Sequence, residues 1–577
     1  MKNISLIMLM ALFFSTACNK VLDKENLTAV SPSDVWNNLT IAQAYMDNIY
    51  ANLMPGNPTG TGNDTDEACT TPTGTNVWLS GKATLDSYDA FDQYYNIRSI
   101  NILLDNINRA TFDTTIKNQL KGQGLFWRAW AYYSLVKSYG GVPLILEAQN
   151  PTSDLTTLAI ARSKTSECVA QILKDLDDAA QLLPDKWTGE DVGKIDKGAL
   201  MAFKGRVLLF FASPLFNGLG GIATWQKAYD ANKAANDFLI AQGKGLYSPY
   251  NKIWDDELNK EVVMVRRYNY PQATYFQGGL ISLDFSKDQT YQDRPSLDLV
   301  NSFPMKDGSS WNSQPRDYAT LFKDRDDRFV TDIYYNGCPI QYAKGMREKN
   351  TYLWTYYDVI TDYYSVSGIA GQHNQLTADQ FPSPSSFFRM KAIDKNINAS
   401  EVHKATVDWP EIRYTEVLMN YGECANEIGN TQAAFEVLKQ IRQRAGILSG
   451  TSGNYGLTGT SQDAIRTLYQ NERFVEFCFE GKRWDDLRRW KMFGYLRNLT
   501  KRHGLAIELK LGETGVNPMD DINKVYTKFK NTIITTDQDP IAIKDDYYIY
   551  GIPKTRLDRN AKLQQNNNWG GSFDPYQ

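Results

Sequence analysis

Long helical segments that follow one another in pairs limit most strongly what this 577-residue chain can fold into. Apolar residues recur at helical spacing in each segment, and glycine or proline follows most of them. The pairs are 117–139 with 163–183, 196–212 with 224–242, and 411–428 with 430–445. A fourth pair begins at Ser461, and small residues such as Ala202 and Gly205 occupy positions where helices would touch. We therefore expect a mainly α-helical fold with about four tetratricopeptide-like helix pairs, a design that extends one domain by stacking.

The region between these pairs has a different character. Helical spacing is lost over residues 245–405, where glycine, proline, serine and tyrosine dominate and segments such as 261–270 resemble short strands. Long ordered loops in a compact protein usually carry function. We expect one domain over 40–577. Its parts are a helical scaffold (40–244 and 406–500), a loop-rich ligand-binding part with few short strands (245–405) and a C-terminal segment (501–577).

The N-terminus carries the pattern of an export signal. Lys2 precedes an apolar run from Ile4 to Phe14, and eleven residues make a helix of about 16 Å, which is too short to cross a bilayer. Small residues then lead to Cys18, in an order that resembles a bacterial lipobox. We expect residues 1–17 to be a signal peptide, Cys18 to be lipidated, and residues 18–39 to hold a tether. A plain signal peptide with an incidental cysteine is the alternative.

Charge, cysteine and histidine usage exclude several classes of protein. With 62 Lys and Arg against 66 Asp and Glu, the net charge is only −4, which does not favour nucleic-acid binding. Without Cys18, five cysteines remain and none forms a CxxC pair, so buried free thiols are favoured over a disulfide framework, although one disulfide stays possible. The three histidines are isolated, and the 324–327 acidic cluster fits a solvated charge run better than a calcium site. No metal or cofactor is expected.

The densest charged segment is NERFVEFCFEGKRWDDLRRW, residues 471–490. Its glutamates Glu472, Glu476 and Glu480 are four residues apart, which predicts that all three lie on one face of a helix. Paired carboxylates can perform acid–base chemistry, as in glycoside hydrolysis. Arginines are abundant here and in the preceding helix pair, however, so buried ion pairs between helices are the favoured interpretation. The predicted structural salt-bridge residues are Glu472, Arg473, Glu476, Glu480 and Arg483.

Several segments together resemble one known family. The 471–490 segment is similar to the late motif of the SusD/RagB family of Bacteroidota outer-membrane lipoproteins. Further segments resemble that family in its own order: SPSDVWNN, RAWAYYSLVKSYGGVPLI, IRYTEVLMNYGECANEIGN, IRQRAG and YIYGIPKTRLDRNAKLQQNNNW. Each is moderately specific, but together, behind a lipobox, they are strongly specific, and the resemblance spans essentially the whole chain.

This resemblance implies a SusD-like fold and a role outside catalysis. Such proteins are lipid-anchored in the outer membrane, are exposed at the cell surface, and cap a SusC-like TonB-dependent transporter to which they hand oligosaccharides. A branch related to RagB handles peptides instead, and that alternative stays open. A glycan-cleaving enzyme that uses two of the 472, 476 and 480 carboxylates is a further alternative.

Aromatic residues in loops are the candidates for ligand contact. Sugars have an apolar face and a rim of hydroxyls, so Trp and Tyr suit the face, and Asn and Asp suit the rim. The candidate ligand-binding residues are Trp78, Asn76, Asp66, Trp311, Trp354, Tyr356, Tyr291 and Tyr275. For Trp78 the alternative is packing against the next helix, and for the aromatic run 351–364 it is a strand whose aromatic face belongs to the core. Four tryptophans at helical spacing are assigned to the core: Trp127, Trp130, Trp484 and Trp490.

Overall fold

The structure is a computed structural model, and it describes residues 32–577 with gaps. The gaps are 70–75, 151, 278–292, 312–321, 336–337, 341–350, 354–384, 398–400 and 510–525. The predicted signal peptide and Cys18 lie outside the described residues, as do three of the candidate ligand residues, Tyr291, Trp354 and Tyr356.

Helices are the main regular elements of the described chain and strands are few and short, which confirms the predicted fold class. They are α2 (Pro32–Asn37), α3 (Leu39–Leu53), α4 (Gln93–Asn106), α5 (Thr114–Tyr139), α6 (Leu155–Leu158), α7 (Thr165–Ala180), α8 (Lys197–Ala212), α9 (Trp225–Ala241), α10 (Leu297–Ser302), α11 (Asp327–Asp332), α12 (Tyr414–Glu427), α13 (Thr431–Arg444), α14 (Gln462–Glu476), α15 (Arg483–Arg489), α16 (Phe493–Leu499) and α18 (Lys554–Arg559). No helix among these residues is long and apolar enough to span a membrane.

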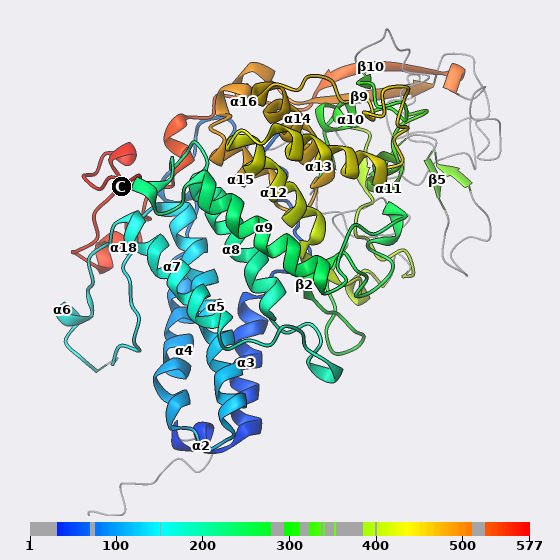
Figure 1. The fold of residues 1–577 in the computed structure, drawn as a ribbon. Coiled ribbons are helices and arrows are strands. Elements are labelled where there is room, and N and C mark those ends of the chain that lie inside the picture. Colours follow the sequence, from blue (N-terminus) through cyan, green and yellow to red (C-terminus); the bar gives the residue numbers. More distant parts are fainter. Residues whose placement is uncertain are drawn as a thin grey trace, which may run out of the picture.

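The helices pack as the sequence pairs them. Helix α5 packs against α4 and α7, α8 against α9, and α12 against α9, α13 and α14. Figure 1 shows this scaffold rising from α3, α4 and α5 through α8 and α9 to α12–α15. Local signals set several ends: Asp196 caps α8 by accepting from the Ala199 amide, Ser461 caps α14, and Gly140 ends α5 at φ 75°.

Strands are short and occur in antiparallel pairs within the described residues. The pairs are β1 (Ala68–Cys69) with β3 (Arg294–Pro295), β2 (Val262–Arg266) with β8 (Trp409–Arg413), β4 (Ile333–Tyr334) with β7 (Phe388–Arg389), β5 (Cys338–Ile340) with β6 (Thr351–Leu353), and β9 (His503–Leu509) with β10 (Phe529–Thr535). In Figure 1 the β9–β10 ribbon lies at the end of the molecule away from α3 and α4.

Two helix predictions need correction. The predicted helix 411–428 begins only at Tyr414, because residues up to Arg413 pair with β2 and the Tyr414 amide bonds the Glu261 carbonyl. The predicted helix face shared by three glutamates also ends early. Helix α14 stops at Glu476, and Phe479 adopts φ 60°, so Glu480 lies in the turn that follows.

Two large hydrophobic clusters form the interior of the described chain. The first lies within the helix pairs and includes Trp127 and Phe203. The second lies under the loop-rich part and the β9–β10 ribbon and includes Phe303 and Phe329. The turn after α14 contributes a side chain to each cluster: Phe477 packs in the first and Phe479 in the second.

Candidate functional site

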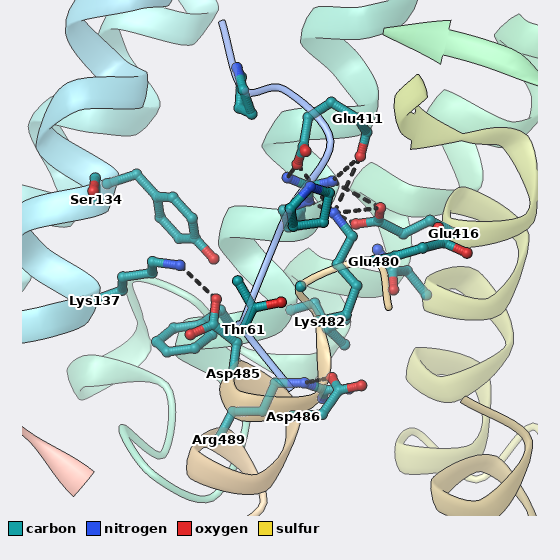
Figure 2. Close-up of a pocket in the computed structure, with 18 of the residues that line it drawn as sticks. Thr61, Ser134, Lys137, Glu411, Glu416, Glu480, Lys482, Asp485, Asp486 and Arg489 are labelled. Atoms are coloured by element: carbon teal, nitrogen blue, oxygen red, sulfur yellow. Dashed lines mark hydrogen bonds and ion pairs between the residues drawn. The ribbon is translucent and has the colours of Figure 1, made fainter. Parts of the chain in front are cut away.

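A cavity of about 270 Å³ lies where the scaffold meets the first loop of the chain. Its wall combines the loop after α3, the C-terminal half of α5, helix α8, the β8–α12 junction and the turn into α15. Figure 2 shows side chains from these elements converging on one space. The five elements are far apart in sequence, so the cavity exists only in the folded chain.

Charged side chains line much of this cavity, and their signs balance. The cations are Lys137, Arg206, Arg473, Lys482 and Arg489, and the anions are Glu411, Glu416, Glu480, Asp485 and Asp486. Arg206 donates to Glu416 through Nε at 2.6 Å and to Glu411 through Nη1 at 2.7 Å. Lys482 donates to Glu411, and Lys137 donates to Asp485. The wall therefore carries no unbalanced formal charge.

The ion pairs set the titration of the wall carboxylates. Burial alone would raise the pKa of Glu416, but Arg206 and Lys482 more than offset that effect and bring its pKa to about 2. Burial would also raise the pKa of Asp485, but the charges of Lys137 and Arg488 outweigh burial and lower this pKa below its usual value. Glu416 and Asp485 are therefore ionised at neutral pH.

Apolar groups and hydroxyls fill the rest of the wall. Trp130, which sequence spacing assigned to the core, is only partly buried and lines the cavity beside Phe210. Pro55 and Pro58, in the loop after α3, also line it. Helical spacing identifies the inward face of α5, but it does not show that the loop after α3 leaves a cavity over this face.

The row of glutamates forms a separate buried network. Glu476 pairs with Arg444, Arg413 and Arg328, and burial, which would raise its pKa, is outweighed so that its pKa falls to about 2. Glu472 pairs with Arg442 and Arg328, and Glu480 with Arg413 and Lys391. Arg473 and Arg483 pair with Asp486 and Asp66. All of these side chains are buried, so the network ties distant elements together, and three of its members, Glu480, Arg473 and Asp486, also border the cavity.

The 324–327 cluster is only partly the solvated run that was expected, since Asp324 is exposed and Asp327 is partly exposed. Arg325, Asp326 and Arg328 are buried, and Asp326 both caps α11 and accepts from Arg328 at 2.7 Å. Within the described chain no group of three or more His, Cys, Asp or Glu side chains is arranged to hold a metal ion. Four cysteines, Cys69, Cys168, Cys424 and Cys478, are free and buried.

The first group of candidate ligand residues lies against the scaffold. The Trp78 ring is 8% exposed and sits 4.9 Å from the Tyr550 ring and 5.3 Å from the Tyr547 ring. Asn76 donates to the Asn63 carbonyl and to Asp64. Asp66 accepts two hydrogen bonds from Arg483, at 2.8 and 2.6 Å. These side chains therefore have protein partners, and their contact with a ligand stays a prediction.

The other described candidates lie elsewhere. Trp311 is 7% exposed and belongs to the second hydrophobic cluster, so the structure does not bring it into the cluster that holds Trp78. Tyr275 is half-buried, with its ring 5.0 Å from Tyr268. Two further rings of this segment are exposed: Tyr270, between these two tyrosines, at 60%, and Phe276, directly after Tyr275, at 48%. Sequence reasoning missed both, although the run YNYPQATYF was a visible signal.

The architecture defines a class of protein: a helical-pair scaffold that supports a loop-rich part with short strands. A family model described as the SusD family matches residues 251–569. A second model, described as starch-binding and associating with the outer membrane, matches residues 22–209. The chain belongs to the SusD family, whose members are generally carbohydrate-binding proteins associated with the outer membrane.

Individual relatives agree with this assignment. The SusD-like proteins P38 and P2 of Formosa agariphila are each 22% identical to the chain, over 69% of its length and 71% and 70% of theirs. A crystal structure of a SusD-like protein from Bacteroides fragilis matches 94% of this chain and 99% of its own, with a TM-score of 0.72 and 22% identity. A laminarin-binding SusD-like protein matches 92% of this chain and 99% of its own, with a TM-score of 0.58 and 16% identity. These structural matches establish the fold.

Proposed function

We propose that this protein is a non-enzymatic, cell-surface lipoprotein that captures oligosaccharides and passes them to a SusC-like TonB-dependent transporter. Lipidation of Cys18 would attach it to the outer membrane. Attachment confines it to the membrane that holds its partner, which raises their effective concentration without any new contact. Family membership and the lipobox-like N-terminus support these assignments.

The exposed aromatic turn at residues 268–276 carries the proposal for a glycan. Asn269 and Ala273 pair backbone to backbone and hold the turn, while Tyr270 and Phe276 present their rings to solvent. Lys404 lies 5.4 Å from the Tyr270 ring centre and pairs with Glu401, so charged groups flank an apolar surface. Rings stack on the apolar face of a sugar, and flanking polar groups bond its hydroxyls.

Several contacts must act together to give useful affinity. One aromatic contact contributes about 1 kcal/mol, whereas micromolar binding needs about 8 kcal/mol. The remaining sequence candidates, Trp78 and Trp311 among them, are therefore kept in the proposal as contacts to be tested beside Tyr270, Phe276 and Tyr275.

Affinity measurements on a panel of polysaccharides test this proposal. The expected result is binding to a defined glycan by the protein, with a loss of at least tenfold in the variant that combines Tyr270→Ala and Phe276→Ala. Tyr95→Ala is the matched control, because Tyr95 is 69% exposed on helix α4 of the scaffold. Equal binding by the wild type and the double variant would show that the glycan does not bind at this turn.

Two further outcomes would favour the alternatives, and two more test the anchor and the partner. New reducing ends after prolonged incubation with a bound polysaccharide would support an enzyme. Binding of peptides from a protease digest in preference to every glycan would support the peptide-handling alternative. For the anchor, Cys18→Ala protein is expected to leave the outer-membrane fraction, and the wild type is expected to co-purify with a SusC-like transporter.

A further inference from the structure

The cavity of Figure 2 has features that the proposed surface site does not use. It lies in the scaffold, and its wall takes nothing from the exposed turn at 268–276. A volume of about 270 Å³ falls just below the range of about 300–1,000 Å³ that holds drug-sized ligands. It also exceeds an engineered cavity of about 150 Å³ that takes benzene. A single substituted six-membered ring fits that size, and a chain of rings does not.

The charges of the wall argue for a neutral ligand. Each carboxylate of the wall already accepts from a cation, and the guanidinium of Arg206 is shared between Glu411 and Glu416. Binding a charged molecule would break such a pair and leave a charge uncompensated. The Lys137–Asp485 pair is the most exposed of these ion pairs of the wall, with both side chains about one quarter exposed.

Two polar groups of the wall lack a partner among the residues that the structure describes. The Tyr133 side chain is 94% buried, and no hydrogen bond engages its hydroxyl. Asn420 is 99% buried; its Oδ1 accepts from Arg473, and its amide nitrogen donates to no described residue. Neither atom is among the enclosed polar atoms without a partner, so both are open to the cavity, where they can donate to the oxygen atoms of a bound molecule.

The remaining wall is apolar. It includes Trp130 and Phe210 from the helices and Pro55 and Pro58 from the loop after α3. An occupant therefore needs a neutral ring with an apolar face and with hydroxyl or ring oxygens at its edge. We propose that this cavity is a second binding site that takes one neutral hydroxylated ring, a monosaccharide unit that is either free or at the end of a chain.

Ligand-detected saturation-transfer NMR tests the site on the purified protein. The probes are methyl glucoside, methyl galactoside, methyl mannoside and a linear glucose trisaccharide. At least one single ring is expected to bind saturably with millimolar affinity, a weak value that suits a ligand of this size. Tyr133→Phe, which removes only the hydroxyl, is expected to weaken binding by about tenfold.

A blocking variant provides an independent readout. Thr61 is exposed at the cavity, and Figure 2 places it between Lys137 and Lys482. Thr61→Phe is expected to abolish binding, while Thr451→Phe, at an exposed turn away from the cavity, leaves it unchanged. Competition by the trisaccharide would identify the occupant as a chain end, and failure to compete would identify it as a free sugar.

The two proposals fail separately. The variant that combines Tyr270→Ala and Phe276→Ala is expected to lose the polysaccharide and to keep the single ring. The cavity proposal is overturned if no single ring binds saturably, or if Tyr133→Phe and Thr61→Phe both bind as the wild type does. Thermal unfolding of each variant verifies that the scaffold is intact.

Discussion

Glu67 is a buried carboxyl group that forms no ion pair with a cation of the described residues. It is 1% exposed, its Oε1 accepts from the Phe479 amide at 3.0 Å, and its Oε2 has no partner among the described residues. Burial, with the nearby charge of Asp293, raises its pKa to about 8. Glu67 is therefore mostly protonated at neutral pH, in contrast to Glu476, which its arginine partners keep ionised.

This raised pKa predicts a loss of stability at high pH. The folded state holds the proton that the unfolded chain releases near pH 4.5, so the free energy of unfolding should fall as pH rises from about 4.5 to about 8. The steepest contribution is about 1.4 kcal/mol per pH unit. Glu67→Gln, which stays neutral, should lose this contribution and gain stability relative to the wild type as pH rises. Urea unfolding at a series of pH values measures the difference.

The matched control for that experiment is Glu190→Gln, at an exposed position. Its free energy of unfolding should follow that of the wild type at every pH. Parallel curves for Glu67→Gln and the wild type would show that Glu67 ionises in the folded protein as it does in the unfolded chain.

At the level of elements, helix α8 depends on a glycine at its contact with α9. A Cβ atom at Gly205 would lie 2.3 Å from Oδ1 of Asn232, whose amide nitrogen donates to the Gly205 carbonyl at 3.1 Å. Gly205→Ala should therefore separate the two helices and lower the free energy of unfolding by about 1–3 kcal/mol, although alanine is the better helix former. Denaturant unfolding measures this loss.

Gly245→Ala is the appropriate control, since no heavy atom lies within 4 Å of the added Cβ and its backbone is not in the left-handed region. It should unfold as the wild type does. An unchanged or higher stability for Gly205→Ala would mean that α8 and α9 can adjust without cost.

Periodicity predicts helices well here because each helix buries one continuous face. The spacing that predicted 196–212 also marked Gly205 as a contact position, and α8 spans Lys197–Ala212. The same reasoning failed at 411–413 and at Glu480. Residues 411–413 form a strand because they pair with β2, and Glu480 leaves the helix face because Phe479 adopts a left-handed conformation. Neither the strand partner nor this backbone conformation can be recognised from a local pattern of apolar residues.

The candidate site was predictable only in part for a similar reason. Arg483 and Asp66 form a bidentate pair although 417 positions separate them, and no local pattern links them. Trp130 and Tyr133 have the spacing of core residues, and the space above them depends on where the loop after α3 runs. Aromatic composition drew attention to the tyrosine-rich loops, but it could not separate the exposed Tyr270 from the buried Tyr268.

For the whole molecule, the arrangement of the two hydrophobic clusters predicts a single unfolding unit. Phe477 packs in the first cluster, whereas Phe474 and Phe479 pack in the second, so the end of α14 cannot unfold without disturbing both. Buried ion pairs add to this link, since Arg413 of β8 bonds Glu480 and Arg483 bonds Asp66. Residues 40–577 should therefore behave as one domain.

Calorimetry of the wild type and of Arg483→Ala tests this view. The wild type should give one transition whose calorimetric and van't Hoff enthalpies agree. Arg483→Ala leaves the buried Asp66 carboxylate without its cation, so it should lower the free energy of unfolding by about 3–5 kcal/mol while still giving one transition. Arg497→Ala, which removes a largely exposed pair with Asp545, should change stability by less than about 0.5 kcal/mol. Two resolved transitions, of which Arg483→Ala shifts only one, would contradict this prediction. The scaffold and the loop-rich part would then be separate folding units, and ligand binding in the loops could change while the stability of the helix pairs stayed the same.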